Sequence, residues 1–474
     1  LFDFIYQLPY FISSFFILIG LGLVMSFKLT LVLSFILSGI FMFFFSKEFF
    51  GDERQAFLVT IFYQFFPFRL IELFVRGSFG EVYAYTFLPL VLYGVIKIFH
   101  NKQILRYRIL TAFATAFLVL SHNSVSLLFF LMIVGFVLIF GKSKEKIIQA
   151  GTSLGLGILL SAFYWFPAIY DHKFTYGDLY MANLYKEHFA PIQNFFIPNL
   201  TNDRSLLTGG IAVSLGLMQV VTLITVVWLF WKKKIDQKQK KIVYAVFGLL
   251  FISLFFMQPV SYFLWERIAI LRQFQFPWRF LAVCGFGIAL LSSLLLRVFK
   301  NNMAYWIIIG ITVFSTFVYW QPVLGYDKID ENYYWNFPLN TTYYGETDVI
   351  WSAGPAKGYP KQPIEFAVGT GSFGNYLKKS SIHSYTVKAL KDSVISDNTV
   401  YFPGWRAYVD GKEVPIEFQD QNWRGIITFP VKKGVHAIRV EFTETKPRRD
   451  ADLVSLGTLL FLCGILVLKH YEKK

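Results

Sequence analysis

The short connection spanning residues 69–81 concentrates ionisable side chains where two apolar runs meet. It carries Arg69, Glu72, Arg76 and Glu81. A carboxylate beside an arginine can hold a divalent metal or a phosphate. Charged side chains at membrane depth destabilise a protein, so those that occur there usually have a function. Glu81 is therefore a candidate for holding a metal, and Arg76 for contacting phosphate. A plain helix cap at Glu81, paired with Arg76 or Arg69, is the competing interpretation.

The turn Ser121-His122-Asn123-Ser124 joins two further apolar runs. A histidine in this position could contact an anionic head group or transfer a proton, so His122 and Asn123 are candidates for lining a site. Asn and Ser also cap helices, which is the alternative explanation of the turn.

The longer connection 168–209 brings Asp171 and His172 together with several aromatic side chains. Aromatic rings beside carboxylates are typical of sugar sites, and they are also typical of the aromatic belt at a membrane interface. We assign the tyrosines to the belt and keep Asp171 and His172 as candidate substrate contacts.

The connection 258–279 contains three arginines, of which Arg272 and Arg279 are singled out here. A guanidinium matches the geometry of a phosphate, so both residues are candidate phosphate ligands. A salt bridge to Glu266 is the alternative.

The composition indicates which elements must position these residues. Of the 474 residues, 55% are hydrophobic, 20% aromatic and only 16% charged, which is typical of a protein that has lipid as its solvent. A formal charge of +15 would suggest nucleic acid in a soluble protein. Here it matches the enrichment of Lys and Arg in cytoplasmic loops, and we expect no nucleic-acid partner. No P-loop and no HExxH motif occurs, and the pattern GxSxG is met only at Gly151–Gly155, inside an apolar run rather than after a strand.

Eleven runs are apolar enough to predict membrane helices, in a chain that we expect to have 11 to 12 of them. The runs are Leu29–Ser46, Gln55–Phe68, Val82–Phe99, Ile109–Ser121, Val125–Phe140, Ile147–Pro167, Gly210–Trp231, Ile242–Met257, Phe280–Leu296, Ala304–Trp320 and Leu453–Leu468. A twelfth run, Pro9–Phe27, could span the membrane or lie in its interface.

Basic residues recur in alternate connections, above all in Lys232–Lys241. This alternation places those connections in the cytoplasm of a multi-pass membrane protein. The candidate residues then face outward, as does the segment 321–452.

Residues 321–452 have ordinary polarity and alternating strands, which predict an extracytoplasmic β-sandwich. Asp410-Gly411 is a strong hairpin signal. We therefore expect a transmembrane domain over 1–320, a mainly β domain over 321–452, and a final membrane helix with a basic tail over 453–474.

Three motifs resemble a known family of bacterial and archaeal membrane proteins, named for a 6-pyruvoyl-tetrahydropterin synthase-related domain. They are Val75–Glu81, Phe87–Leu90 and Leu120–Asn123, while Tyr401–Gly411 resembles YfhO-like membrane proteins. The sequence lacks the zinc-binding histidine cluster of a pterin synthase, so pterin chemistry is not expected.

Both groups resemble polytopic glycosyltransferases of the GT-C fold, which take a sugar from a polyprenyl-phosphate carrier. The resemblance implies a catalytic Asp in a first outer loop and an acidic residue near the metal or donor phosphate in a second. Asp3 and Glu81 are the corresponding residues here, and we expect the first span and most of the first loop to precede Leu1. A divalent metal, Mg²⁺ or Mn²⁺, is the implied cofactor, with Glu81 as its ligand.

The predicted function is inverting transfer of a sugar from a polyprenyl phosphate to a glycan, polymer or lipid acceptor outside the cytoplasm. Membrane lipids are the remaining expected partners. Trp405 and Trp423 of the sandwich are candidate acceptor contacts, with simple scaffolding as the alternative role of that domain. A transporter or flippase for lipid-linked glycans and a non-catalytic membrane scaffold stay open as rival functions.

Overall fold

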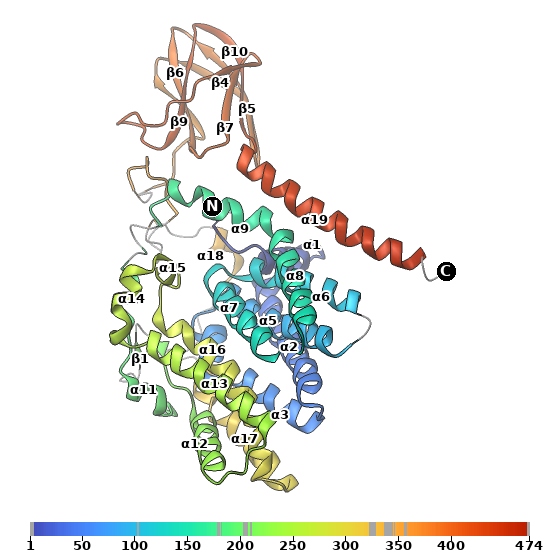
Figure 1. Ribbon diagram of the computed structural model, residues 1–474. Coiled ribbons are helices and arrows are strands. Elements are labelled where there is room, and N and C mark those ends of the chain that lie inside the picture. The colour runs from blue at the N-terminus through green and yellow to red at the C-terminus, as the bar shows by residue number, and fades with distance from the viewer. Residues whose placement is uncertain are drawn as a thin grey trace.

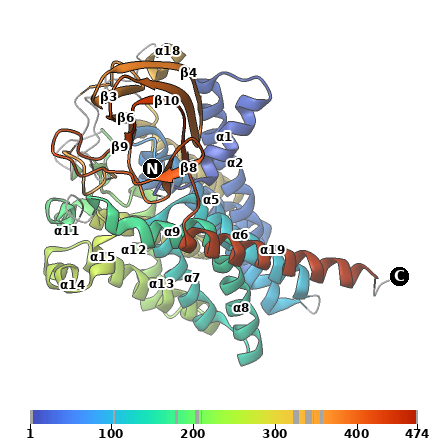
Figure 2. The ribbon, with the colours of Figure 1, turned by 90° about the horizontal axis from the view of Figure 1, so that it is seen from above.

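The computed structural model describes residues 4–101, 104–177, 181, 183–201, 207–208, 211–321, 329–335, 345, 347–354 and 358–471. Figure 1 shows a helical bundle with a β-sandwich at one end. The chain starts beneath the sandwich, and the last helix, α19, runs obliquely away from it. Seen from above in Figure 2, α19 extends well beyond the bundle.

Long apolar helices form the bundle. Among the described residues, eight helices are long and apolar enough to cross a membrane, and ten spans result if each of two bent pairs counts as one. The main helices are α1 Leu8–Leu18, α2 Leu23–Phe50, α3 Glu53–Gln64, α5 Phe79–His100, α6 Ile104–Ser121, α7 Asn123–Phe140, α8 Lys144–Leu160, α9 Ala162–Asp171, α12 Leu217–Trp231, α13 Gln237–Phe256, α16 Leu281–Ser292, α17 Asn302–Phe314 and α19 Lys446–Tyr471.

Shorter elements connect these helices. They are α4 Pro67–Leu70, η1 Ile71–Val75, η2 His172–Phe174, η3 Leu184–Glu187, α11 Ile192–Phe196, β1 Leu207–Thr208, β2 Ile211–Ala212, η5 Pro259–Ser261, α14 Tyr262–Arg267, α15 Ala269–Arg272, η6 Pro277–Phe280, η7 Ser293–Arg297, η8 Phe317–Tyr319 and α18 Glu331–Trp335.

The polytopic class is confirmed, although three of the predicted runs differ from straight spans. The run Gln55–Phe68 bends by 55° before Pro67, and Ile147–Pro167 bends by 66° after Leu160. Proline lacks the N–H that would continue the preceding helix, which explains the first bend. The described part of the run Gly210–Trp231 contains the strand β2 and the shorter helix α12, of 15 residues.

The undecided run Pro9–Phe27 does not form one helix. It divides into α1 and the start of α2, with Gly20 between them at φ +95°. Glycine adopts this left-handed conformation without the steric cost that a side chain imposes, so the chain turns there.

The basic connections gather at the end of the bundle opposite the sandwich, which we call the lysine-rich end. Lys97 pairs with Glu48 and so joins α5 to α2. Lys146 Nζ donates to the carbonyl of Asn101 at 3.1 Å, and Arg297 pairs with Asp236 at 2.6 Å. The predicted alternation of basic connections thus corresponds to one physical end of the molecule.

The C-terminal β domain is a sandwich of two antiparallel sheets. One sheet has the strand order β4-β5-β10-β7-β8 and the other β3-β6-β9. The strands are β3 Ile364–Val368, β4 Gly371–Lys379, β5 Ile382–Ala389, β6 Ser393–Val400, β7 Trp405–Val409, β8 Lys412–Val414, β9 Ile426–Val431 and β10 Gly434–Phe442. The fully buried side chains of Val387, Ile395, Phe429 and Val440 form the core between the sheets.

Two sequence signals of the sandwich are confirmed. Asp410 and Gly411 both have positive φ, +51° and +77°, as expected for the two-residue turn between β7 and β8. Alternation in β10 buries Ile438 and Val440, whereas Arg439 between them is exposed.

Candidate functional site

Glu81 lies in the first turn of α5 and is completely buried. Its Oε1 accepts from Arg76 Nη1 at 2.9 Å and from Arg279 Nη2 and Nε at 3.0 and 3.1 Å. One carboxylate oxygen therefore holds two guanidinium groups that belong to separate connections. We call Glu72, Arg76, Glu81, His122 and Arg279 the Glu81 cluster.

Gly80 allows the start of α5 to approach the turn between α6 and α7. A Cβ atom on Gly80 would lie 2.4 Å from the carbonyl oxygen of Ser121 and 2.7 Å from the ring of Tyr6. Only glycine fits there, and the resulting close packing brings His122 Nε2 within 3.8 Å of Glu81 Oε1.

The π-helical turn η1 places Glu72 against Arg76. Glu72 is fully buried, and its Oε2 lies 2.5 Å from Arg76 Nη1. Arg76 also lies over the ring of Trp278, with 4.8 Å between the guanidinium carbon and the ring centroid. Among the described residues, Glu72 Oε1 and Glu81 Oε2 have no hydrogen-bond partner. The cluster thus combines two arginines with two carboxylates, and one oxygen of each carboxylate has no hydrogen-bond partner among the described residues.

Arg279 reaches Glu81 from the short helix η6, which precedes α16. Its Nη1 donates to the carbonyl of Phe274 at 2.8 Å and to Gln275 Oε1 at 2.9 Å. The side chain of Arg279 is only 5% exposed. The predicted alternative partner, Glu266, is not the one that Arg279 uses.

His122 faces Glu81 as a neutral imidazole. Its Nδ1 accepts from the backbone N–H of Val125 at 3.3 Å, so the ring proton is on Nε2, the atom nearest Glu81. Burial lowers the pKa of His122 to about 3 and outweighs the opposing effect of the Glu81 carboxylate. The ring of Tyr6 stacks on His122 at 5.2 Å.

Asn123 links the cluster to the start of the chain. Its side chain bonds to the hydroxyl of Tyr164, and its Nδ2 donates to the carbonyl of Phe4 at 3.4 Å. The described residues Phe4 and Tyr6 therefore cover the turn that carries His122. Asp3, the other predicted catalytic residue, lies outside the described residues.

Three other predicted contacts lie apart from the cluster. Asp171 is buried and pairs with Arg448 of α19 at 2.9 Å, while Arg448 Nη1 donates to the carbonyl of Pro403. This pair joins α9 to the sandwich. His172 packs edge-on against Phe4, and Arg272 donates to the carbonyl of Glu266 at 2.8 Å.

Of the two candidate tryptophans, one lies in a strand of the sandwich and the other in the connection before β9. Trp405 begins β7 and packs against His383 and Phe442 at ring distances of 5.6 and 5.4 Å. Trp423 lies before β9 and is half-buried. Trp405 thus belongs to the packing of the sandwich against His383 and Phe442.

The residues around Glu81 do not form a recognisable metal site. Within the described part of the chain, no group of three or more His, Cys, Asp and Glu side chains is placed to hold a metal ion. Glu81 Oε1 already accepts from two guanidinium groups, which would repel a divalent cation. We therefore assign no chemical step to a metal at this position.

Sequence reasoning singled out four of the five cluster residues and missed Glu72. The signal for Glu72 was its spacing from Arg76, because residues four apart on a helix lie on the same face. Tyr6 and Tyr164 carried no comparable signal, since tyrosine is common throughout this chain.

The comparisons with known proteins agree with the membrane architecture. Residues 2–323 match the family model described as "6-pyruvoyl-tetrahydropterin synthase related domain; membrane protein". The chain belongs to this family. The match includes the whole Glu81 cluster and ends before the sandwich. No curated protein and no solved structure matches the chain.

Proposed function

We propose that this family member transfers a sugar from a polyprenyl-phosphate carrier to an acceptor on the side of the membrane that carries the sandwich. The observation that supports this function best is the convergence of Arg76 and Arg279 on Glu81 at that end of the bundle. Arginine pairs suit the phosphate of such a donor, and buried charges within a membrane protein usually serve function.

Arg76 is the residue we assign to direct phosphate contact. It uses Nη1 for both carboxylates, so its Nε and Nη2 make no hydrogen bond to any described residue. Its side chain is 20% exposed, compared with 5% for Arg279. In this proposal Glu72 and Glu81 hold the guanidinium of Arg76 in place, Arg279 holds Glu81, and His122 and Asn123 line the site.

The proposed reaction inverts the anomeric carbon of the sugar. The acceptor hydroxyl oxygen forms a bond to that carbon while the bond from the carbon to the carrier phosphate oxygen breaks. The electron pair leaves with the polyprenyl phosphate, whose charge Arg76 stabilises, and the hydroxyl proton passes to a carboxylate. Asp3 is our candidate for that carboxylate.

The test uses the full-length protein in proteoliposomes with labelled polyprenyl-phosphate sugars. Arg76→Lys keeps the charge but loses the planar donor pair, so we expect transfer to fall by at least tenfold. Arg272→Lys is the matched control, because among the described residues the hydrogen bond of the Arg272 side chain goes to the backbone carbonyl of Glu266. Its transfer rate should stay within twofold of the unmodified protein.

Two outcomes would contradict the proposal. Unchanged transfer in Arg76→Lys would remove Arg76 from the site. Movement of the intact carrier across the bilayer, without loss of sugar by any variant, would instead support the flippase. Folding of each variant is checked by its unfolding midpoint in detergent.

A further inference from the structure

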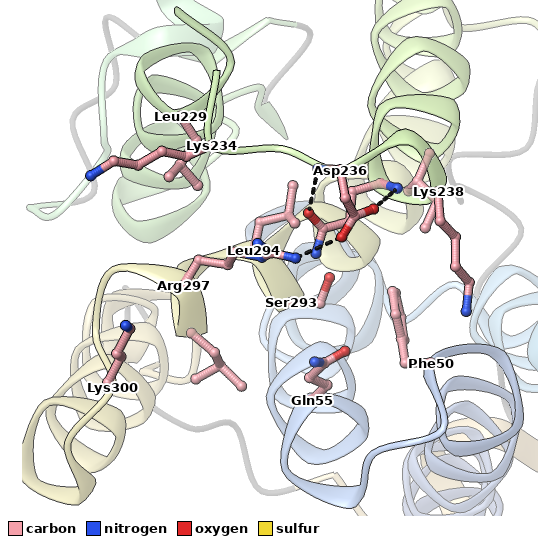
Figure 3. A pocket seen from close by; sticks show the side chains of 13 residues that line it. Phe50, Gln55, Leu229, Lys234, Asp236, Lys238, Ser293, Leu294, Arg297 and Lys300 are labelled. Carbon is pink, nitrogen blue, oxygen red and sulfur yellow. Dashed lines mark hydrogen bonds and ion pairs between the residues drawn. The ribbon is translucent and has the colours of Figure 1, made fainter. Parts of the chain in front are cut away.

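A second candidate site lies at the lysine-rich end, far from the Glu81 cluster. A cavity of about 760 Å³ lies there among the ends of α2, α3, α12, α13 and η7. Figure 3 shows it from close by. Its volume falls within the range of pockets that bind small molecules, and it greatly exceeds the space that one water needs.

Positive charge dominates the lining of this cavity. It contains Lys234, Lys238, Arg297 and Lys300 but only one carboxylate, that of Asp236, so four cations against one anion leave an excess of three. In Figure 3 Lys234 and Lys300 lie on one side of the cavity and Lys238 on the other, with the ammonium groups of Lys234 and Lys238 pointing outward, whereas Arg297 points toward Asp236.

The single carboxylate is already engaged. Asp236 Oδ2 pairs with Arg297 at 2.6 Å, and Oδ1 accepts from the backbone N–H of Gln239 at 2.9 Å as the N-cap of α13. Within the described ranges, no carboxylate lies within ion-pair distance of Lys234, Lys238 or Lys300. The three lysines therefore lack a carboxylate partner among the described residues, and Lys234 Nζ lies 5.2 Å from the ring centroid of Trp228.

The remaining walls are apolar or carry neutral polar groups. Phe50, Leu229 and Leu294 supply hydrocarbon surface, and Gln55 and Ser293 supply an amide and a hydroxyl. Figure 3 shows the side chain of Gln55 beside the cavity, opposite Asp236. Cations next to hydrocarbon, at the end of a membrane bundle, suit a ligand that carries both a phosphate and an acyl region.

We propose that this cavity binds the phosphodiester head group of an anionic membrane lipid from the leaflet at the lysine-rich end. Lys238, Lys300 and Lys234 neutralise the phosphate, and Gln55 donates to its ester oxygens. The upper part of the lipid packs against Phe50 and Leu229. This site is independent of the proposed sugar transfer, because it involves other residues at the opposite end of the bundle.

The test compares two double variants of the full-length protein by native mass spectrometry in detergent. The probes are phosphatidylglycerol and phosphatidylcholine with identical acyl chains. Lys238→Gln with Lys300→Gln should weaken phosphatidylglycerol binding by about 25-fold, since each lysine contributes roughly fivefold. Lys142→Gln with Lys144→Gln removes the same charge from exposed positions at the same end, outside the cavity, and should change binding by less than twofold.

Three results would overturn the assignment. Equal losses in both double variants would indicate diffuse charge attraction rather than a site. Equal binding of phosphatidylcholine would exclude recognition of net anionic charge. Displacement of the lipid by an equimolar amount of inorganic phosphate would identify a free-phosphate site instead.

Discussion

The energetic role of Glu81 can be measured by replacing it with glutamine, which keeps the shape of the side chain and removes its charge. Arg279 then loses its only described carboxylate and keeps two neutral acceptors, Phe274 O and Gln275 Oε1. Arg76 keeps Glu72 at 2.5 Å. The cost should therefore fall mainly on Arg279.

The expected magnitude follows from the burial of the pair. Removing one partner of a buried ion pair typically costs about 3–5 kcal/mol, and the Arg279 side chain is only 5% exposed. Because Arg279 retains two neutral hydrogen bonds, we expect the lower end, about 3 kcal/mol, for Glu81→Gln. The double variant with Arg279→Gln should lose much less than the sum of the two single losses.

The assay is a double-mutant cycle on the free energy of unfolding, measured by titrating the detergent-solubilised protein with a denaturing detergent. The coupling between Glu81 and Arg279 should exceed about 1.5 kcal/mol, and it should be larger than that between Glu81 and Arg76. A coupling below about 0.5 kcal/mol for Arg279, or the reverse order of the two couplings, would refute this account of the cluster.

Three further predictions concern the surroundings of the cluster. Gly80→Ala should lower the unfolding free energy by about 1–3 kcal/mol through overpacking against Ser121. The control Gly135→Ala, which has open space around it, should leave the unfolding free energy unchanged. Equal effects of the two substitutions would contradict the close approach of Gly80 to Ser121. The neutral state of His122 implies that stability is full above pH 6.5 and falls by up to about 1.4 kcal/mol per pH unit below it, because only the unfolded chain takes up the proton. His122→Gln should flatten the slope of unfolding free energy against pH between pH 6.5 and 5. An unchanged slope would contradict the neutral state of His122. Asp171→Asn should loosen the sandwich from α9 and speed proteolysis near Pro403, and the idea fails if the cleavage rate stays constant.

Much of the fold follows from the sequence because lipid and water impose different compositions. Long apolar runs predicted the helices, and the Asp410-Gly411 turn predicted the hairpin of β7 and β8. The bends before Pro67 and after Leu160 were missed because the apolar composition continues through both of them. The hydropathy of a segment indicates whether it lies in lipid or in water, but it does not indicate where the helix axis bends.

The individual residues of the Glu81 cluster could be predicted from the sequence, but the pairs that they form could not. Arg279 is 198 positions from Glu81, and no local pattern indicates which charge pairs with which across that distance. For the same reason the partner of Asp171 could not be predicted, because Arg448 is 277 positions away. Proximity to His172 and aromatic residues suggested a sugar contact for Asp171, whereas the structure pairs it with α19.

The most direct test of the central claim is a single-turnover measurement with full-length protein and a labelled polyprenyl-phosphate sugar in proteoliposomes. The proposal predicts that free polyprenyl phosphate and glycosylated acceptor appear in equal amounts, and that Arg76→Lys slows both at least tenfold while Arg272→Lys does not. A carrier that keeps its sugar through the whole time course, with a correctly folded protein and a range of acceptors, would contradict it.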